Sequence, residues 1–437
     1  MIINMNNLKK PLVLFLLLGS ISATATPAWE AIDELVANNS AQVIEWRRWF
    51  HQHPELSNRE FNTAEYVARE LTNMGLEVKA GIAKTGVVAL LRGGRSGNTV
   101  ALRADMDALP VREQTGLEFA STVEAEFDGN KVGVMHACGH DAHMAILLGA
   151  AKTLSTMRDK IPGNVLFIFQ PAEEGAPEGE EGGAELMLAE GLFAQYKPDA
   201  VFGMHVGLNT PHKTIALRRG PLMAAVDTLR ITVHGRQSHG ARPWNGVDPI
   251  VTAAQIVNAL QTIVSRQVDI TQAPAIITIG KFSGGVRHNI IPDKVEMWGT
   301  IRSFDADMRD QLHSKIRQVV NNTAAAAGAT ASIDIDIGYP VTINDGALYD
   351  QMLPTLVRVS AGREILTPNL KTGAEDFSFF ANQVPGIYFF LGSVSEGVDP
   401  ATAPSNHSPM FDVDESVLEV GTRALSHLAI DFLANNQ

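Results

Sequence analysis

The chain has 437 residues, of which 45% are hydrophobic, and it carries a formal net charge of -13 at pH 7. This length and composition suffice for two domains that each bury a core of their own. The acidic balance disfavours nucleic acid and anionic membranes as partners, so we expect neither. Because Cys138 is the only cysteine, an internal disulfide is excluded.

The first 25 residues have the pattern of a cleavable export signal. Lys9 and Lys10 precede the apolar residues 11–18, and the small residues Ala23-Thr24-Ala25 suit a cleavage site. The apolar stretch is shorter than the ~20 residues that a membrane-spanning helix needs. We therefore expect an exported protein, periplasmic or secreted, that has no membrane contact after cleavage.

Three histidines, an aspartate and the only cysteine fall within eight positions, His136-Ala137-Cys138-Gly139-His140-Asp141-Ala142-His143. Thiolate, imidazole and carboxylate groups hold zinc and related metals, and Gly139 lets the backbone turn so that Cys138 and His140 can face one ion. The alternative is a buried structural cysteine with capping residues ahead of the helix expected at 142–156. The clustering favours a metal site.

Short apolar runs alternate with helical periodicity around this motif, which predicts an α/β domain. A helical stretch from 29 to 74 is interrupted at residues 51–57. His51 and His53 in that interruption could bind metal, or they could be ordinary polar residues between two surface helices. Strands are expected at 85–91, 99–103, 164–169 and 200–205.

Polar side chains follow three of these strands. Asp105 comes after the second strand and either serves the chemistry or caps a turn. Glu173 and Glu174 come after the third: one can ligate a metal while the other acts as general base, or both can begin a solvated acidic loop. His205 ends the fourth. Because open α/β sheets bind ligands at the carboxyl ends of their strands, we expect these side chains to converge on one crevice.

Residues 218–337 predict a second domain that is inserted into the first, which would comprise residues 26–217 and 338–437. The expected order is strand, helix, strand, strand, helix, strand, the βαββαβ order of a ferredoxin-like unit, at residues 227–234, 247–265, 275–282, 294–303, 307–327 and 331–337. The first domain then resumes with a strand at 386–391 and a closing helix at 414–433.

Four polar residues of the later chain are candidates for the site. His239 lies in an exposed-looking loop and Asn289 flanks a hairpin. Arg302 lies in an alternating strand, where it either binds a carboxylate with two parallel hydrogen bonds or faces solvent. His407 lies in a loop between two prolines and is well placed to return to the first domain.

Taken together, five motifs resemble the metal-dependent amidohydrolase branch of the aminoacylase and carboxypeptidase superfamily, which includes hippurate hydrolases, auxin-conjugate amidohydrolases and N-acetyl-diaminopimelate deacetylases. The motifs are Arg103-Ala104-Asp105-Met106-Asp107-Ala108-Leu109-Pro110, His136-Ala137-Cys138-Gly139-His140-Asp141, Gln170-Pro171-Ala172-Glu173-Glu174-Gly175, Gly373-Ala374-Glu375-Asp376-Phe377 and Asn406-His407-Ser408-Pro409. The resemblance runs in order from about His51 to Phe411. It implies a mixed-sheet, zinc-peptidase-like catalytic domain with an inserted lid domain that usually forms a homodimer.

The resemblance also implies roles for individual residues. Zinc or manganese, one or two ions per subunit, would be held by Cys138, His140, Glu174, His205 and His407. Glu173 would be the general base, with Asp105 beside it in the catalytic crevice. His239 would reach the partner subunit's active site to stabilise the oxyanion, and Asn289 and Arg302 would hold the substrate carboxylate.

One position departs from the wider superfamily. Many relatives have a histidine two residues before the aspartate that ends the second strand, and this chain has Arg103 there. The resemblance therefore suggests that Cys138 belongs to a branch with a rearranged ligand set.

The function that these expectations favour is hydrolysis of the amide bond of N-acyl or N-aroyl amino acids by a metal-activated water. Two alternatives remain: a metallo-carboxypeptidase on small peptides, and a periplasmic binding protein that clamps a metal or solute without chemistry. Glu173 separates the last from the others, because a pure binder needs no second carboxylate beside the ligand Glu174.

Overall fold

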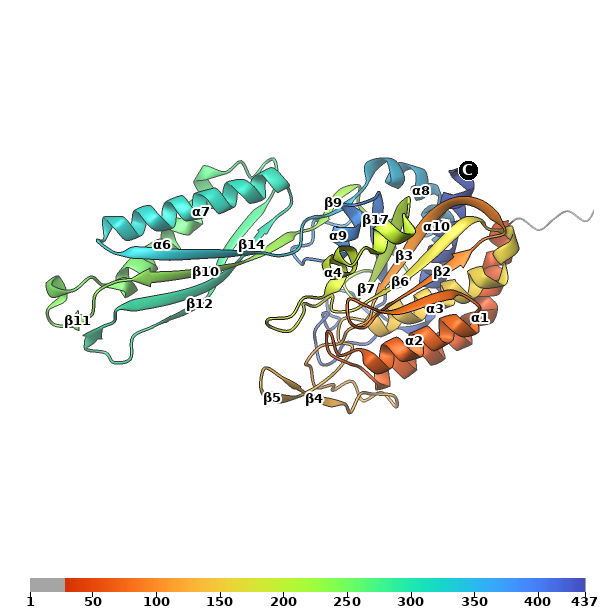
Figure 1. The fold of residues 1–437 in the computed structure, drawn as a ribbon, viewed down its shortest axis with the longest axis horizontal. Helices are drawn as coiled ribbons and strands as arrows, with labels where there is room; N and C mark the ends of the chain where they lie inside the picture. The colour runs from red at the N-terminus through yellow and green to blue at the C-terminus, as the bar shows by residue number, and fades with distance from the viewer. Residues whose placement is uncertain (1–27, 437) are drawn as a thin grey trace, which may run out of the picture.

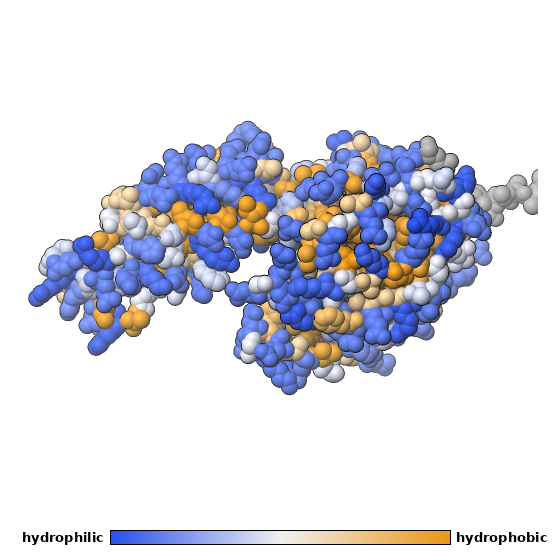
Figure 2. Space-filling view, in the orientation of Figure 1, coloured by the Kyte–Doolittle hydropathy of each residue, from blue (hydrophilic) through white to orange (hydrophobic). Residues whose placement is uncertain are grey.

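The computed structural model describes residues 28–436, so the expected export signal lies outside the described residues. Figure 1 shows two domains, which we call the body (residues 28–224 and 338–436) and the lid domain (residues 225–337). Figure 2 shows that both are mostly hydrophilic on the visible surface, with an open space between the lid domain and the lower part of the body. Within residues 28–436, no helix is long and apolar enough to cross a membrane.

A seven-stranded mixed sheet forms the centre of the body. Its order is β1-β2-β6-β3-β7-β17-β8, with bounds Glu77–Ile82, Gly86–Arg92, Pro162–Gln170, Arg95–Asp105, Ala200–Gly207, Gly386–Gly392 and Ile215–Ala216. Strands β6, β3, β7 and β17 are mutually parallel, and the pairs β1–β2, β2–β6 and β17–β8 are antiparallel. The carboxyl ends of four parallel strands therefore meet at one edge.

The sheet is buried on both faces because its residues alternate between two apolar cores. In β6, Val165, Phe167 and Phe169 join one core, whereas Leu166 and Ile168 join the other. The first core is covered by α1 (Ala28–Gln52), α2 (Phe61–Asn73), α3 (His140–Thr156), α8 (Gly346–Val359) and α10 (Leu418–Asn435), and the second by α4 (Gly183–Ala189), α5 (Leu192–Tyr196) and α9 (Phe377–Ala381). Helix α3 packs on the sheet beside α10 and is covered by α1, which explains why it is buried on nearly every face.

The lid domain is a four-stranded antiparallel sheet with two helices. Its strands lie in the order β12-β14-β10-β15, with bounds Ala275–Gly284, Lys294–Ser303, Ala225–His234 and Thr330–Ile337. Helices α6 (Pro249–Thr262) and α7 (Ala306–Ala326) pack on it around a core that is separate from those of the body. The short pair β11 (Ser238–His239) and β13 (Ile290–Ile291) lies at the tip farthest from the body (Figure 1).

Adjacent strands carry the chain into and out of the lid domain. Strand β9 (Gly220–Met223) precedes it, β16 (Thr342–Asn344) follows it, and the two pair with each other. The Val226 N–H donates to the Tyr339 carbonyl at 3.0 Å, and the Gly338 N–H donates to the Val226 carbonyl at 3.1 Å. The insertion thus begins and ends at one place.

The predicted α/β class and mixed sheet are confirmed, and several boundaries differ. The helix expected at 247–265 begins at Pro249, because the side chain of Asp248 caps it by accepting the N–H groups of Ile250 and Val251. Strand β1 and the hairpin β4 (Glu124–Phe127) and β5 (Asn130–Gly133) were not predicted. Asp128 and Gly129 at the hairpin turn have φ of 50° and 73°, as a type I′ turn requires.

Candidate metal and catalytic site

Neighbouring parallel strands carry the predicted side chains to one edge of the sheet. Strand β3 ends on Asp105, β6 leads through Pro171 and Ala172 to Glu173 and Glu174, and His205 lies near the end of β7. Asp107, two residues beyond β3, accepts the backbone N–H groups of Glu173 and Glu174, each at 3.0 Å. The expected convergence of these strand ends is what the structure shows.

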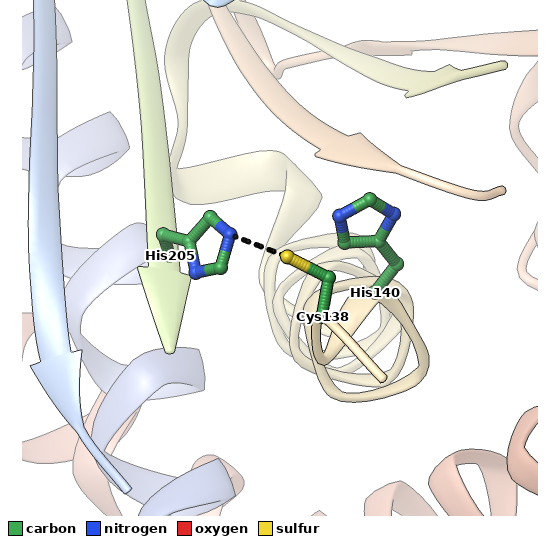
Figure 3. A group of neighbouring side chains, drawn as sticks. All are labelled: Cys138, His140 and His205. Atoms are coloured by element: carbon green, nitrogen blue, oxygen red, sulfur yellow. Dashed lines mark hydrogen bonds between the residues drawn. The ribbon is translucent and has the colours of Figure 1, made fainter. Parts of the chain in front are cut away.

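The motif around Cys138 enters the same crevice from the start of α3. Gly139 has φ of 92°, and a Cβ at this position would lie 2.4 Å from Val206 Cγ2. Only glycine therefore fits the turn that sets Cys138 and His140 on one side. In Figure 3 these two side chains and His205, which comes from β7, point toward one region.

In two imidazoles of this cluster, one nitrogen is fixed by a backbone carbonyl and the other is turned toward the cluster. His140 Nδ1 lies 2.8 Å from the Asp107 carbonyl oxygen, and His205 Nδ1 lies 2.6 Å from the Val206 carbonyl oxygen. Each Nδ1 therefore carries a hydrogen that it donates, so Nε2 is the nitrogen that would bind a metal in place of a proton. His140 Nε2 is buried and has no hydrogen-bond partner, and His205 Nε2 lies 3.4 Å from Cys138 Sγ.

Glu174 and His407 complete the cluster from two loops. His407 Nε2 lies 3.1 Å from Glu174 Oε1, and the His407 N–H donates to the Ala137 carbonyl at 2.8 Å. Sulfur, nitrogen and oxygen atoms that could hold a metal lie within 4.8 Å of one another in three overlapping groups: Cys138, His140 and His205; Cys138, Glu174 and His407; and His140, Glu173 and Glu174. The donor types and the orphaned His140 nitrogen fit a divalent cation such as zinc.

The charges around the cluster also favour a cation. Burial alone lowers the pKa of His140, but the nearby carboxylates of Asp105 and Asp107 outweigh this effect and raise the pKa to about 10. Burial, with Glu174 and Glu173 nearby, raises the pKa of the Cys138 thiol. The carboxylates thus favour a positive charge at this place, and a metal would have to displace the thiol proton in order to bind there.

Burial is the main cause that raises the pKa of Glu173, and the neighbouring Glu375 and Glu174 raise it further. Its Oε2 atom lies 3.8 Å from His140 Nε2, and its backbone carbonyl accepts the Tyr339 hydroxyl at 2.8 Å. Glu173 is therefore a buried carboxyl group that favours holding a proton, at the edge of the candidate metal cluster.

Asp105 does not face the pocket as a free carboxylate. Its Oδ1 atom accepts His143 Nδ1–H at 2.6 Å, while His143 Nε2 accepts the Val206 N–H at 2.9 Å. Its Oδ2 atom accepts Arg103 at 2.7 Å. Asp105 therefore supports the site from behind, and both nitrogens of His143 are occupied.

Arg103 is fully buried and joins three carboxylates. Besides Asp105, it contacts Glu375 and Asp376, each at 2.9 Å, and it donates to the Gln170 side chain at 2.8 Å. Glu375 and Asp376 in turn lie with Glu173 in one group of close carboxylates. The residue that departs from the superfamily pattern thus balances the negative charge behind the general-base candidate.

A pocket of about 530 Å³ opens over the metal cluster. Arg302 from the lid domain and Lys371 from the body both line it and are half-buried. His239 and Asn289 do not line it: they lie at the far tip of the lid domain, where the Gly240 N–H donates to the Asn289 carbonyl at 2.9 Å (Figure 1). Within one chain, the structure brings Arg302 to the cluster and leaves the other two lid residues apart from it.

Comparison with known proteins identifies the family. Residues 101–431 match the model of peptidase family M20/M25/M40. The chain is 42% identical to thermostable carboxypeptidase 1 of Saccharolobus solfataricus, over 91% of this chain and 98% of that protein. It is 38% identical to the N-acetyl-L-cysteine deacetylase of Bacillus subtilis, over 91% of this chain and 89% of that protein.

The chain belongs to peptidase family M20/M25/M40. A solved structure agrees: the YxeP protein of Bacillus subtilis, a dinuclear metal-binding peptidase from family M20, is 34% identical, with a TM-score of 0.76 over 91% of this chain and 99% of that one. As a member of the M20 family, the protein is a metal-dependent amidohydrolase. The alternative hypothesis, a binding protein that holds a metal or solute without chemistry, is therefore wrong.

Sequence reasoning missed several residues of this M20 site. Glu375 and Asp376 lie in one of the five motifs, but the sequence pattern assigns them no role. Tyr339 and Lys371 lie in no motif that predicts a functional residue. His51 and His53 do not join the cluster: His51 contacts Asp141 at 2.8 Å and Glu113 at 3.0 Å, and the exposed His53 bonds the Trp49 carbonyl. Neither histidine belongs to the cluster, and the alternative of polar residues between surface helices holds for His53 alone, because His51 is buried in the last turn of α1.

The environment of His51 predicts a dependence of stability on pH. Against the effect of burial, its hydrogen bonds to Asp141 and Glu113 raise its pKa from 6.5 to about 9. This contribution to stability is complete below pH 6.5 and is lost as pH rises through about 9. We expect the body to lose on the order of 2 kcal/mol of unfolding free energy from His51 over this interval.

Urea unfolding at several pH values measures this loss. His51→Gln is expected to flatten the profile between pH 6.5 and 9.5, whereas His53→Gln, at an exposed position two residues away, leaves it unchanged. The same slope in all three proteins would show that other groups set the pH dependence.

Proposed function

We propose that this M20 protein hydrolyses the amide bond of N-acyl or N-aroyl amino acids, releasing a carboxylic acid and an amino acid. The observation that carries the proposal is the pocket of about 530 Å³, in which two cationic side chains face a cluster of metal-binding type with a buried glutamate. A substrate with an amide and a free carboxylate matches both features.

We assign the free carboxylate of the substrate to the part of the pocket that Arg302 and Lys371 line. Among the described residues, Arg302 makes no ion pair, and its half-burial lowers its pKa, so an anionic partner would stabilise it. Burial also lowers the pKa of Lys371, whose Nζ lies 5.4 Å from the centre of the Phe390 ring. Both side chains are thus suited to an anionic group of the substrate.

Cys138, His140, Glu174, His205 and His407 are proposed to hold the metal, zinc or manganese, as one or two ions. When bound, the metal would polarise the substrate carbonyl and lower the pKa of a coordinated water. Glu173 is proposed to accept a proton from water at its carboxylate and to pass it to the departing nitrogen. Tyr339, which binds the Glu173 backbone, and Asp107, which accepts its N–H, keep this glutamate in place.

Two further proposals concern assembly and location. We infer a homodimer in which His239 of the partner subunit stabilises the oxyanion, because His239 is exposed at the lid tip and too remote for its own pocket (Figure 1). Light scattering, which measures the molar mass in solution, checks the dimer.

Export to the periplasm or medium is proposed from residues 1–25 alone, and cell fractionation checks it.

A substrate panel tests the function. Purified protein is incubated with N-acetyl amino acids, N-benzoyl amino acids, dipeptides and the matching carboxamides, with zinc or manganese or with a chelator. We expect release of free amino acid that the chelator abolishes, and a reduction on the order of tenfold or more when the carboxylate is blocked as carboxamide. Absence of release from every acyl substrate would contradict the proposal.

A second candidate is carboxypeptidase action on short peptides, which the 42% identity to thermostable carboxypeptidase 1 favours. It uses the same groups, since the cleaved amide again lies next to a free carboxylate. The dipeptides of the panel decide between the two, because a carboxypeptidase would prefer them to the acetyl and benzoyl substrates.

A further inference from the structure

A second cavity, of about 500 Å³, shares one lining residue, Glu174, with the pocket described above. Ser57, on the wall of the second cavity, donates to Asp107 at 2.7 Å, and Asp107 accepts the backbone N–H of Glu174 at 3.0 Å. The second cavity is therefore adjacent to the metal cluster and has a ligand candidate in common with the first pocket.

Part of the wall of this cavity is apolar, although charged residues also line it. The apolar residues come from three separate segments: Leu56 after α1, Leu109 and Pro110 after β3, and Phe127 at the end of β4. Pro177, in the loop that follows Glu174, also lines it. Apolar walls of this kind gain free energy when they cover an apolar group of a ligand.

The hairpin β4–β5, which carries Phe127, is anchored to the body. Val123 and Ala125, at the start of the hairpin, pack on a small apolar cluster of Leu56, Ala108 and Val134. The Val134 N–H donates to the Val123 carbonyl at 2.9 Å, which closes the hairpin at its base. Phe127, which lines the cavity and is 40% exposed, is carried by this anchored hairpin.

The charged groups at the rim are acidic. Glu126, Asp128 and Glu178 line the cavity and make no ion pair among the described residues. The single cationic side chain of the lining, Arg59, is engaged by Glu180 at 2.5 Å. An anionic group would therefore be repelled here, whereas a neutral apolar group would not.

We propose that this second cavity receives the acyl group of the substrate and selects apolar, bulky acyl groups over anionic ones. The assignment rests on the function proposed above: with the carboxylate near Arg302 and the amide at the metal cluster, the acyl group extends away from Arg302, and the second cavity is lined by the ligand candidate Glu174. Phe127 and Ala176, which also lines the cavity, are then specificity-determining residues.

Steady-state kinetics with one amino acid and four acyl groups, acetyl, butyryl, succinyl and benzoyl, tests this assignment on the metal-loaded full chain. Wild-type protein is expected to prefer butyryl to succinyl by on the order of tenfold or more in kcat/KM. Ala176→Phe, which fills the cavity, is expected to lower kcat/KM for benzoyl by at least about tenfold and for acetyl by less than about threefold.

Phe127→Ala provides a second variant, which removes a wall without filling the cavity. It is expected to reduce the preference for benzoyl over acetyl several-fold. Trp29→Ala is the control, because Trp29 is similarly exposed at 43% and lies on α1 outside the cavity lining. Circular dichroism and metal analysis of each purified variant show that the protein is folded and loaded.

The outcomes separate the two proposals. If wild-type protein hydrolyses acyl substrates but both cavity variants keep its acyl preference, the acyl group binds elsewhere and the proposed function stands. If wild-type protein hydrolyses none of the four substrates, both proposals are overturned.

Discussion

Replacing Glu173 by glutamine is expected to lower kcat by about 10²–10⁴-fold, the range that removal of a general base produces. Glutamine keeps the size of the side chain and its hydrogen-bonding atoms but cannot accept the proton of a water. The five proposed ligands remain, so metal content should be unchanged. Measurement of kcat together with metal analysis of the purified variant checks both parts.

The control for Glu173 is Glu181→Gln, an exposed residue of the acidic loop that lies outside both cavities. It should behave as wild type. Because Glu173 also lies in one of the candidate ligand groups, a Glu173→Gln protein that loses both activity and metal would assign the residue as a ligand. Unchanged turnover would remove it from the mechanism altogether.

The second large effect is expected from Arg103→Met, which should lower the unfolding free energy by about 3–5 kcal/mol. The reason is that Asp105, Glu375 and Asp376 would remain buried without their common cation. Burial already raises the pKa of Asp376 to about 8 with Arg103 beside it. Methionine fills much of the space, so the loss reports chiefly the uncompensated charge.

Urea unfolding at neutral pH measures this loss, with Arg92→Met as control. Arg92 lies at the end of β2, is exposed and pairs only with Glu77 at the surface, so little change is expected there. Equal effects of the two substitutions would mean that the carboxylates behind Glu173 take up protons and tolerate the loss of Arg103.

The meeting of Asp105, Glu173, Glu174 and His205 could be predicted because it depends on local patterns. Each strand is a short apolar run, each polar group follows its end, and parallel strands place their ends together. The order of strands and helices in residues 218–337 could be predicted for the same reason. Prediction of these features requires only the hydrophobic periodicity of the sequence and the rules for connecting strands and helices.

Other features depend on contacts between distant segments. Arg103 and Asp376 are separated by 273 positions, and no local pattern tells that a buried arginine will join them. Tyr339 and Lys371 likewise reach the site only because the part of the body that follows the lid domain packs against its first part. The hairpin β4–β5 is different, since Asp128-Gly129 between Phe127 and Asn130 is a recognised turn signal that was overlooked.

The paired strands at the junction of the two domains affect how the molecule unfolds. Val226 and Gly338 are hydrogen-bonded neighbours, so the body holds the two ends of the insertion together even when the residues between them are disordered. The lid domain also has a separate apolar core. We therefore expect the lid domain and the body to unfold as separate cooperative units, in more than one step. Partial melting of the lid would preserve the ligand cluster of the body while removing Arg302 from the pocket.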